Sequence, residues 1–330
     1  MKISVIGAGG WGTALSIHLF RRGFGVILWE NFPDYGKLLD EKRQNVKFLP
    51  GIDIPKGILI TSNIGEATKD RDVIVLAVPS RYFRSVVERI KDFPRDCLFI
   101  SVAKGIEEKL LLRMSQVAEE VLGKITIGVL SGPSHAEEVA RGIPTAVVST
   151  GKDEDIARRI QELFVSQTLR VYTNLDIVGV ELGGALKNII AIACGISDGL
   201  GYGDNTKGAL MTRGLAEISR LGIKMGANPL TFAGLSGMGD MIATCTSKYS
   251  RNRKVGEQIG RGKPLKEVLQ EMEMVAEGVW TVKSALKLAE TFEVEIPITR
   301  SVYEVLWKGK DPKIAVNELM TRTPKREFYF

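Results

Sequence analysis

The chain has 330 residues, of which 44% are hydrophobic and 25% are charged. These proportions are ordinary for a globular protein and exclude a disordered or fibrous chain, and the length favours about two domains. The formal net charge is +6, with 45 Lys and Arg against 39 Asp and Glu, and the basic residues are scattered. We therefore expect a small anionic ligand and no nucleic acid, because nucleic-acid-binding domains concentrate their positive charge on one face.

The three cysteines, Cys97, Cys194 and Cys245, are far apart in the sequence and form no Cys-x-x-Cys pair. This spacing favours neither a zinc site nor a disulfide framework, so we expect no metal and a reducing cytoplasm. The apolar run at residues 3–6 is too short for a secretion signal. The longest apolar stretch, around residues 177–200, contains charged side chains, so we interpret it as a buried helix and expect no integral membrane association.

Taken in chain order, the first half alternates short apolar runs with segments of helical periodicity. The runs are rich in Val and Ile, which predicts strands buried on both faces, at residues 3–6, 26–29, 73–78, 98–102 and 125–130. Helices are predicted between several of these runs, for example over residues 13–22 and 83–90. This βαβα order predicts a parallel, doubly wound sheet.

After about Tyr172, clear strand runs become rare and helical patterns dominate. They lie at residues 177–197, 206–223, 251–261, 264–272, 277–292 and 299–307. We therefore predict an α/β protein whose doubly wound sheet occupies residues 1–175 and whose second, all-helical domain occupies residues 176–330.

A glycine-rich turn follows the first predicted strand. Gly7, Gly9 and Gly12 stand in a Gly-x-Gly-x-x-Gly pattern, with Gly10 and Trp11 inside it. Between a strand and a helix, this pattern is typical of a Rossmann-type dinucleotide-binding domain. The first glycine permits the tight turn, the second lets a pyrophosphate approach the backbone, and the third lets the helix pack on the strand. We therefore predict binding of NAD(H), NADP(H) or both at the helix N-terminus.

Glu30 ends the second predicted strand. An acid at this position binds the adenosine ribose hydroxyls in dinucleotide-binding domains, and its charge would repel the extra phosphate of NADP. We therefore hypothesise a preference for NAD(H). The alternative is a side chain that points to solvent.

Three segments end or follow strands at the carboxyl edge of the predicted sheet, where such sheets bind their ligands. The alternative for each is an ordinary turn, since Gly, Pro and Ser are common turn residues. Three together favour a binding site. The segments are Val78-Pro79-Ser80, Ala103-Lys104-Gly105-Ile106 and Ser131-Gly132-Pro133-Ser134-His135-Ala136.

Lys187 lies in the apolar helix, among Leu, Ile and Ala. Lysine is almost never fully buried unless it is paired, and burial eases the loss of its proton, so Lys187 is a candidate acid or base. The alternative is a structural ion pair, for example with Glu181. Asp240 follows two glycines in a predicted tight loop, residues 235–240, and is a candidate neighbour of the lysine. A helix N-cap or turn aspartate is the alternative for Asp240.

A basic segment, residues 248–254, leads into another predicted helix. Ser250 is a candidate N-cap, and Arg251 and Asn252 in the first turn would form an anion site with the free backbone N–H groups. The alternative is a solvated basic surface. Cations are mildly unfavourable at a helix N-terminus, which favours the bound anion.

Together, these motifs resemble those of bacterial NAD(P)-dependent glycerol-3-phosphate dehydrogenases, from the first strand to about Trp307. The resemblance implies reversible NAD(P)H-dependent reduction of dihydroxyacetone phosphate to sn-glycerol 3-phosphate, an oxidoreductase reaction at a CH–OH group that supplies glycerophospholipid synthesis. The matching segments keep their order and rough spacing: Gly7 to Gly12, Val78-Pro79-Ser80, Lys104-Gly105, Gly132 to Ala136, Gly183 to Asn188, Gly239-Asp240, Ser250 to Arg253 and Val275 to Gly278.

The resemblance also implies roles for individual residues. Lys187 is similar to the family's proton donor and acceptor, with Lys104 and Asp240 beside it in the catalytic site. Many relatives carry a basic residue where this chain has Glu30-Asn31, so the choice between NAD and NADP stays open. The implied substrate contacts are Lys104, Gly132, Ser134, Lys187, Asp240, Ser250, Arg251 and Asn252. The implied cofactor contacts are Gly7, Gly9, Gly10, Trp11, Gly12, Glu30, Lys104, Ala136, Arg251, Val275 and Glu277.

Two alternative functions stay open. A β-hydroxy acid dehydrogenase or a ketopantoate reductase also pairs a dinucleotide domain with a helical one and uses a lysine, but the basic segment favours a phosphorylated substrate. A non-catalytic NADH-sensing protein has no need of a buried proton donor such as Lys187. A histidine relay is disfavoured, because His18 follows the glycine turn and the family gives His135 no such role. A homodimer is expected on base rates alone.

Overall fold

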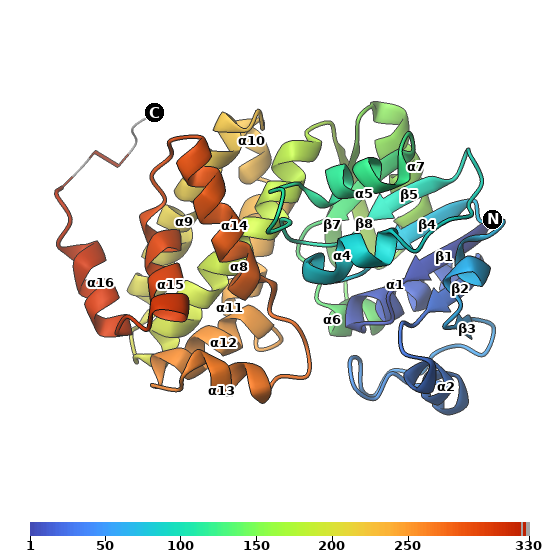
Figure 1. The fold of residues 1–330 in the computed structure, drawn as a ribbon, viewed down its shortest axis with the longest axis horizontal. Helices are drawn as coiled ribbons and strands as arrows, with labels where there is room; N and C mark the ends of the chain where they lie inside the picture. Colours follow the sequence, from blue (N-terminus) through green and yellow to red (C-terminus); the bar gives the residue numbers. More distant parts are fainter. Residues whose placement is uncertain (325, 328–330) are drawn as a thin grey trace. The chain divides into compact units, whose positions relative to one another are not determined.

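The computed structural model describes residues 1–324, 326 and 327, and these divide into two compact units (Figure 1). Unit 1 comprises Met1–Lys104 and Leu112–Glu181, and unit 2 comprises Gly105–Leu111 and the described residues from Leu182 onward. The last division falls inside helix α8, Ile177–Gly199, so one continuous helix belongs to both units. The predicted fold class, a Rossmann-type sheet followed by an all-helical part, is confirmed.

The sheet of unit 1 has eight strands among the described residues, in the order β3-β2-β1-β4-β5-β6-β7-β8. Strands β1 to β6 pair in parallel, as predicted. The prediction of a wholly parallel sheet is wrong, because β7 pairs antiparallel with β6. The strands are β1 Lys2–Ile6, β2 Gly25–Trp29, β3 Leu59–Thr61, β4 Val73–Leu76, β5 Leu98–Ser101, β6 Thr126–Ser131, β7 Thr145–Gly151 and β8 Leu169–Asn174.

Three strands escape the sequence pattern for physical reasons. Strand β3 has only three residues, and none of them is buried. Strands β7 and β8 carry polar residues among their apolar ones, so they lack the continuous Val- and Ile-rich runs of the central strands. An apolar-run criterion therefore finds the centre of this sheet and misses its margins.

Helices cover both faces of the sheet. On one face, α1 (Gly10–Arg21) and α7 (Glu154–Phe164) pack on strand side chains such as Val75. On the other face, α4 (Ser80–Val87) and α5 (Met114–Leu122) pack on its neighbour Ile74. Successive strand residues point to opposite faces, so a sheet covered on both sides requires the continuous apolar runs that the sequence shows.

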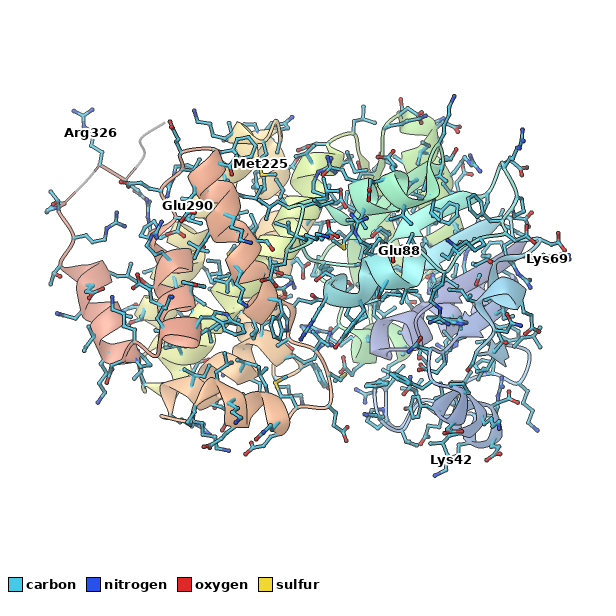
Figure 2. All side chains as sticks on the ribbon, viewed as in Figure 1. Lys42, Lys69, Glu88, Met225, Glu290 and Arg326 are labelled. Carbon is cyan, nitrogen blue, oxygen red and sulfur yellow. The ribbon has the colours of Figure 1, made fainter. Side chains whose placement is uncertain are left out.

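Unit 1 also contains the helices α2 (Pro33–Lys42), α3 (Ile64–Thr68) and α6 (Ala136–Ala140). Charged side chains stand at the ends of several helices and are exposed, as Figure 2 shows for Lys42, Lys69 and Glu88. These three charged side chains therefore lie outside the apolar layers that enclose the sheet.

Unit 2 contains no strand among its described residues. All six helices predicted from periodicity are present, whereas α10, α11 and α16 were not predicted. A π-helical turn, η1 (Leu235–Gly239), leads directly into α11, so the predicted tight loop before Asp240 is wrong. The helices after α8 are α9 Asp204–Lys224, α10 Pro229–Phe232, α11 Asp240–Thr246, α12 Arg251–Gly260, α13 Leu265–Gln270, α14 Glu277–Thr291, α15 Pro297–Lys308 and α16 Pro312–Met320.

Helix α8 packs so closely on α12 that only glycine fits at the contacts. A Cβ on Gly195 would lie 2.0 Å from the carbonyl oxygen of Arg253, and a Cβ on Gly256 would lie 2.1 Å from a backbone oxygen of α8. One turn further along, Gly199 and Gly260 repeat the contact. Glycines four residues apart on both helices therefore bring the two backbones together without intervening side chains.

Among the described residues, α8 is the one helix that is long and apolar enough to cross a membrane. Of its most apolar window, 89% is buried inside the protein. The core helix of a globular protein has the same composition, and this burial agrees with the predicted buried helix.

Glu217, on α9, is only 2% exposed, and its carboxylate accepts three hydrogen bonds at the N-terminus of α15. The backbone N–H groups of Ile298 and Thr299 donate at 2.7 and 3.1 Å, and the Thr299 hydroxyl donates at 3.2 Å. The first turn of α15 has no acid of its own, so Glu217 supplies the negative charge that a helix N-terminus favours. Desolvation outweighs these bonds and raises the pKa of Glu217 to about 7.

We predict that Glu217→Gln removes a pH-dependent part of the stability. A carboxyl whose pKa is raised on folding binds its proton more tightly in the native state, so the free energy of unfolding falls as the pH rises from 4.5 to about 7. The fall due to Glu217 is at most about 3 kcal/mol. Urea unfolding at about pH 5 and about pH 8 should give a smaller difference for the variant than for the wild type. Equal differences in the two proteins would contradict this account of Glu217.

Candidate functional site

The turn between β1 and α1 has the geometry that the glycine pattern predicts. Gly7 has a φ of +113°, which favours glycine, and a Cβ on Gly12 would lie 1.9 Å from the Gly7 carbonyl oxygen. The third glycine therefore lets α1 begin directly against the turn, with Gly9 as its N-cap. The first turn of α1 contains no acidic side chain, and its free N–H groups offer a site for an anion.

The backbone of this turn is open at Gly9. A Cβ on Gly9 would meet no described atom within 4 Å, so the backbone here is open to a ligand. The indole Nε1 of Trp11 is buried and has no hydrogen-bond partner among the described residues. Buried donors are rarely left unsatisfied in native proteins. Both observations fit a cofactor at this turn.

Two segments distant in sequence pack on the turn. Ala136, the first residue of α6, lies against Gly10, where an added Cβ would lie 3.7 Å from the Ala136 Cβ. Asn45, which the sequence analysis missed, donates to the Ala8 carbonyl oxygen at 2.9 Å and to the Thr13 hydroxyl at 2.7 Å. Asn45 is completely buried and fixes the shape of the turn. No local pattern signals this role, because both partners belong to the preceding turn and helix.

Glu30 follows directly on β2 and is 6% exposed, so the alternative of a solvent-facing side chain is wrong. Its carboxylate accepts a hydrogen bond from the Phe32 backbone N–H at 3.0 Å. Burial raises the pKa of Glu30, against the opposing effect of the hydrogen bonds from the backbone. The carboxyl group is therefore held at the end of β2, where the sequence analysis expects it.

The carboxyl ends of β5 and β6 bring three predicted residues together. The Lys104 Nζ donates to the Gly132 carbonyl oxygen at 2.8 Å, and the Ser134 hydroxyl donates to the same oxygen at 2.9 Å. Gly132 has a φ of +125°, and a Cβ there would lie 3.0 Å from the Val147 Cα, so glycine is required. Lys104 and Ser134 are half-buried and form a polar cluster at the edge where such sheets bind ligands.

Residues 78–80 and the two histidines take part in turns and helices of unit 1. Residues 78–80 form the turn from β4 into α4, which begins at Ser80. His18, on α1, is buried, and its Nε2 lies 2.7 Å from the Phe164 carbonyl oxygen. Desolvation lowers the pKa of His18. His135 is the N-cap residue of α6. The arrangement of His18 therefore supports a structural role.

In unit 2, Lys187 of α8 is buried and ion-paired. Its exposed fraction is 5%, and its Nζ lies 3.0 Å from the Asp240 Oδ1. The Nζ also donates to the Thr244 hydroxyl, which donates to the same Asp240 oxygen at 3.2 Å. Asp240 thus lies beside a lysine from another helix, as predicted. The alternative pair with Glu181 is wrong, because the Glu181 carboxylate binds the N-terminus of α5 instead.

The π-helical turn places this group of side chains. A Cβ on Gly183 would lie 2.7 Å from the Ser236 carbonyl oxygen, so η1 packs directly on α8 just before Lys187. Helix α11 then begins with Asp240, and Thr244 follows one turn later on the same face. The sequence analysis missed Thr244, although its spacing from Asp240 is the signal that would have found it. Single π-helical turns are frequent at functional sites.

The basic segment begins α12, as predicted. Ser250 is the N-cap, and its hydroxyl accepts a hydrogen bond from the Arg253 backbone N–H at 3.2 Å. Arg251, the first helical residue, is exposed. The Arg253 guanidinium is committed elsewhere, since its Nε lies 2.6 Å from Asp198. The helix N-terminus and Arg251 therefore form the candidate anion site.

Asn252 links three helices beside Lys187. Its amide donates to the Asn188 side-chain oxygen of α8 at 2.9 Å, and its own oxygen accepts from the Gly278 backbone N–H of α14 at 2.9 Å. Glu277 is the first residue of α14, and Val275 lies just before it. Asn252 thus joins the predicted anion site to the helix of Lys187 and to the helix that begins with Glu277.

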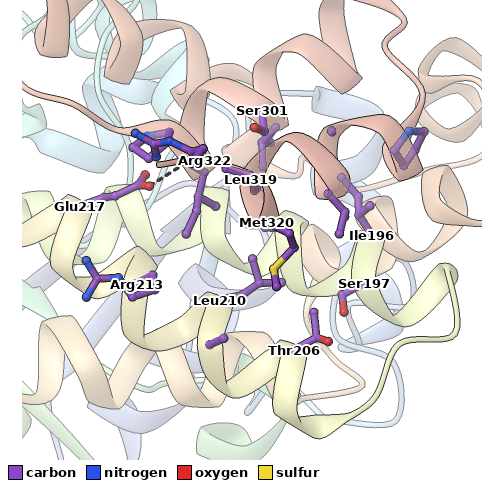
Figure 3. A pocket seen from close by; sticks show the side chains of 18 of the residues that line it. Ile196, Ser197, Thr206, Leu210, Arg213, Glu217, Ser301, Leu319, Met320 and Arg322 are labelled. Atoms are coloured by element: carbon purple, nitrogen blue, oxygen red, sulfur yellow. Dashed lines mark hydrogen bonds between the residues drawn. The ribbon is translucent and has the colours of Figure 1, made fainter. Parts of the chain in front are cut away.

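A groove of about 740 Å³ in unit 2 contains none of these predicted residues. Its lining is mainly apolar and comes largely from α9, α15 and α16, with Arg213, Glu217 and Arg322 among the polar side chains (Figure 3). Over residues 1–324, 326 and 327, no group of three or more His, Cys, Asp or Glu is arranged to hold a metal ion. The candidate site therefore consists of one group of residues in each unit.

Comparison with known proteins identifies the family. The N-terminal model of NAD-dependent glycerol-3-phosphate dehydrogenase matches residues 2–157, and the C-terminal model of the same family matches residues 176–317. The chain belongs to the NAD-dependent glycerol-3-phosphate dehydrogenase family. This membership confirms the resemblance and shows a nicotinamide cofactor, in agreement with the glycine turn.

Full-length relatives of the dehydrogenase family agree. A glycerol-3-phosphate dehydrogenase (NAD(P)+) of Pelotomaculum thermopropionicum is 52% identical over 330 residues, which cover 99% of this chain and 95% of the relative. One from Thermoanaerobacter sp. is 51% identical and covers 100% and 99%. The crystal structure of glycerol-3-phosphate dehydrogenase from Coxiella burnetii has a TM-score of 0.94 at 37% identity and covers 97% of this chain and 99% of that one.

We predict that Gly9→Ala weakens NADH binding by at least about tenfold without unfolding the protein. Gly9 has a φ of −70°, which alanine adopts readily, and the added methyl group would meet no described atom. It would occupy only the space that a pyrophosphate needs. Fluorescence titration with NADH measures the effect. Gly203→Ala is the matched control, because Gly203 is the N-cap of α9 with a φ of −91° and equally open surroundings. Equal NADH affinity in Gly9→Ala and Gly203→Ala would show that the pyrophosphate does not bind at the glycine turn.

Proposed function

We propose that this chain catalyses the reversible, NAD(P)H-dependent reduction of dihydroxyacetone phosphate to sn-glycerol 3-phosphate. The observation that carries the proposal is the buried Lys187–Asp240 pair in a member of a dehydrogenase family. An NADH sensor has no need of a buried proton donor. Family membership and the anion site of α12 favour a phosphorylated ketone over ketopantoate or a β-hydroxy acid.

Ketone reduction needs a hydride at the carbonyl carbon and a proton at the oxygen. The nicotinamide, when bound, supplies the hydride. Lys187 donates its proton to the oxygen in reduction and accepts it back in oxidation. Asp240 and Thr244 hold the Lys187 Nζ in place. The positive charge of the lysine also stabilises the negative charge that develops on the substrate oxygen.

The other residues bind and orient the ligands. Arg251 and the N–H groups at the start of α12, together with Ser250 and Asn252, bind the substrate phosphate and hydroxyl groups. The polar cluster of Lys104, Gly132 and Ser134 contributes further substrate contacts. The cofactor is held by Gly7, Gly9, Gly10, Trp11, Gly12, Glu30, Lys104, Ala136, Arg251, Val275 and Glu277.

Several finer points belong to the same proposal. Residues 1–175 bind the cofactor, and residues 176–330 carry catalysis and most of the substrate site. The enzyme works in the cytoplasm as a homodimer and supplies glycerol 3-phosphate for glycerophospholipid synthesis. The buried Glu30 carboxyl supports a preference for NAD(H), because its charge would repel the extra phosphate of NADP.

The absorbance of NADH tests the reaction. Purified protein should oxidise NADH rapidly with dihydroxyacetone phosphate, and far more slowly with unphosphorylated dihydroxyacetone or ketopantoate. No oxidation of NADH or NADPH, despite measurable cofactor binding, would refute the proposed reaction. The same assay with NADPH tests the role of Glu30, and equal catalytic efficiency with both cofactors would refute the preference for NAD(H).

We predict that Lys187→Ala lowers kcat for dihydroxyacetone phosphate by at least about 100-fold, because the proton donor is lost. NADH affinity should stay at the wild-type value, since the glycine turn is built from unit 1 alone. Steady-state kinetics and NADH titration measure the two effects. Lys310→Ala serves as the control, because Lys310 pairs with Glu304 and Glu318 away from the predicted residues. Near-normal turnover of Lys187→Ala would refute its role.

We predict that Arg251→Ala raises KM for dihydroxyacetone phosphate by about 10- to 100-fold. A hydrogen bond to a charged group contributes about 1.5–3 kcal/mol, and each 1.4 kcal/mol corresponds to about tenfold in affinity. With NADH at saturating concentration, the residual activity with unphosphorylated dihydroxyacetone should be unaffected. Lys254→Ala is the matched control, since it removes an exposed positive charge from the same helix. An equal loss with both substrates would argue against phosphate binding by Arg251.

A further inference from the structure

The chain passes between the two units three times, and two of these passages lie close in sequence to a predicted lysine. Unit 1 first ends at Lys104, begins again at Leu112, and ends finally at Glu181. Lys104 belongs to the polar cluster at the sheet edge, and Glu181 lies on α8, the helix that carries Lys187. The backbone conformation at these passages therefore affects the positions of Lys104 and Lys187.

The segment between the first two passages, residues 105–111, is held by α14 of its own unit. The Ser284 hydroxyl lies 3.3 Å from the carbonyl oxygens of both Ile106 and Glu107. Lys283 lies 3.7 Å from the Glu108 carboxylate. The segment ends at Leu111, whose φ of +61° is unfavourable for a side chain with a Cβ. Strained backbone of this kind persists where surrounding contacts over-determine it.

A second set of contacts, at the N-terminus of α5, comes from Glu181. Its carboxylate accepts a hydrogen bond from the Ser115 backbone N–H at 2.9 Å and one from the Ser115 hydroxyl at 2.6 Å, and it forms an ion pair with Arg113. Arg113 is the N-cap of α5, and the first turn of α5 has no acid of its own. Glu181 is 6% exposed, and both of its oxygens are bonded. We name Glu181, Arg113 and Ser115 the α5–α8 clamp.

The α5–α8 clamp holds the N-terminal part of the helix that carries Lys187. Glu181 precedes Lys187 by six residues, or about 9 Å of helix rise, within the unbroken α8. The contacts of Lys187 with Asp240 and Thr244 lie wholly within unit 2. Loss of the clamp would therefore leave the proton donor intact but free the end of α8 that is anchored in the cofactor-binding unit.

We propose that Glu181 is a positioning residue for Lys187: it holds α8 on the N-terminus of α5 and thereby aligns the proton donor with the cofactor carried by unit 1. This inference rests on the proposed function. Misplacement of a catalytic group by about 1 Å costs up to about 100-fold in rate, so the clamp acts on kcat. In this proposal Glu181 acts through the position of α8 and not through a contact with the substrate.

Glu181→Gln tests the inference, with Glu217→Gln as the matched control. Glu217 is also a buried glutamate that caps a helix from outside, but all its partners lie within unit 2. We expect Glu181→Gln to lower kcat for dihydroxyacetone phosphate by about tenfold or more. The primary isotope effect with NADH deuterated at the transferred position should increase, while the NADH Kd and the pH profile of kcat should not change. Glu217→Gln should lower stability and leave kcat and the isotope effect unchanged.

Ser115→Ala is a milder second variant that keeps the backbone N–H donor and the Arg113 ion pair. It should change kcat and the isotope effect in the same direction and by less, and it keeps the test valid if Glu181→Gln does not fold.

Three results would overturn the inference. They are wild-type kcat in the clamp variants with only a loss of stability, a loss confined to NADH affinity, and a shifted pH profile of kcat. A wild-type protein that does not reduce dihydroxyacetone phosphate would instead refute the proposed function, and the inference with it.

Discussion

The close approach of neighbouring backbone to helix α8 is the constraint on which the buried Lys187–Asp240 pair depends. Gly195 and Gly199 bring α12 into direct contact with α8, and Gly183 does the same for the π-helical turn η1. A side chain at any of these positions would push a neighbouring element outward. Because Asp240 and Thr244 follow η1 directly, the glycine contact decides whether their oxygens reach the Lys187 Nζ. The same close packing on α8 therefore buries Lys187 and brings its polar partners within reach.

A second theme is the use of buried glutamates at helix N-termini. Glu181 binds the start of α5, and Glu217 binds the start of α15, and neither helix has an acid in its own first turn. A carboxylate from another helix satisfies N–H groups that would otherwise be orphaned and complements the positive end of the helix dipole. In contrast, α12 is capped by the hydroxyl of its own Ser250, and α1 begins after Gly9 with no side-chain cap. Helix starts in this protein therefore differ in whether the cap comes from a distant carboxylate, from the preceding side chain or from neither.

The candidate site could be predicted in part because some of its residues carry their signal locally. The glycine turn, the Ser250 cap and the lysine in an apolar helix each depend on neighbours within one element. Asn45 and Thr244 were not predictable in this way, and neither was the true partner of Glu181. Their roles arise from contacts between segments far apart in the chain, which no periodicity or motif records.

The sequence by itself determined the alternation of strands and helices in the first half, the helical second half, the dinucleotide turn and the candidate lysine, because apolar periodicity and glycine spacing act over short distances. Only the tertiary structure decided that β7 runs antiparallel to β6, that Asp240 begins a helix after a π-helical turn, and that Lys187 pairs with Asp240 and not Glu181. Strand direction and ion-pair partners are settled by which elements pack together, and that depends on the whole core.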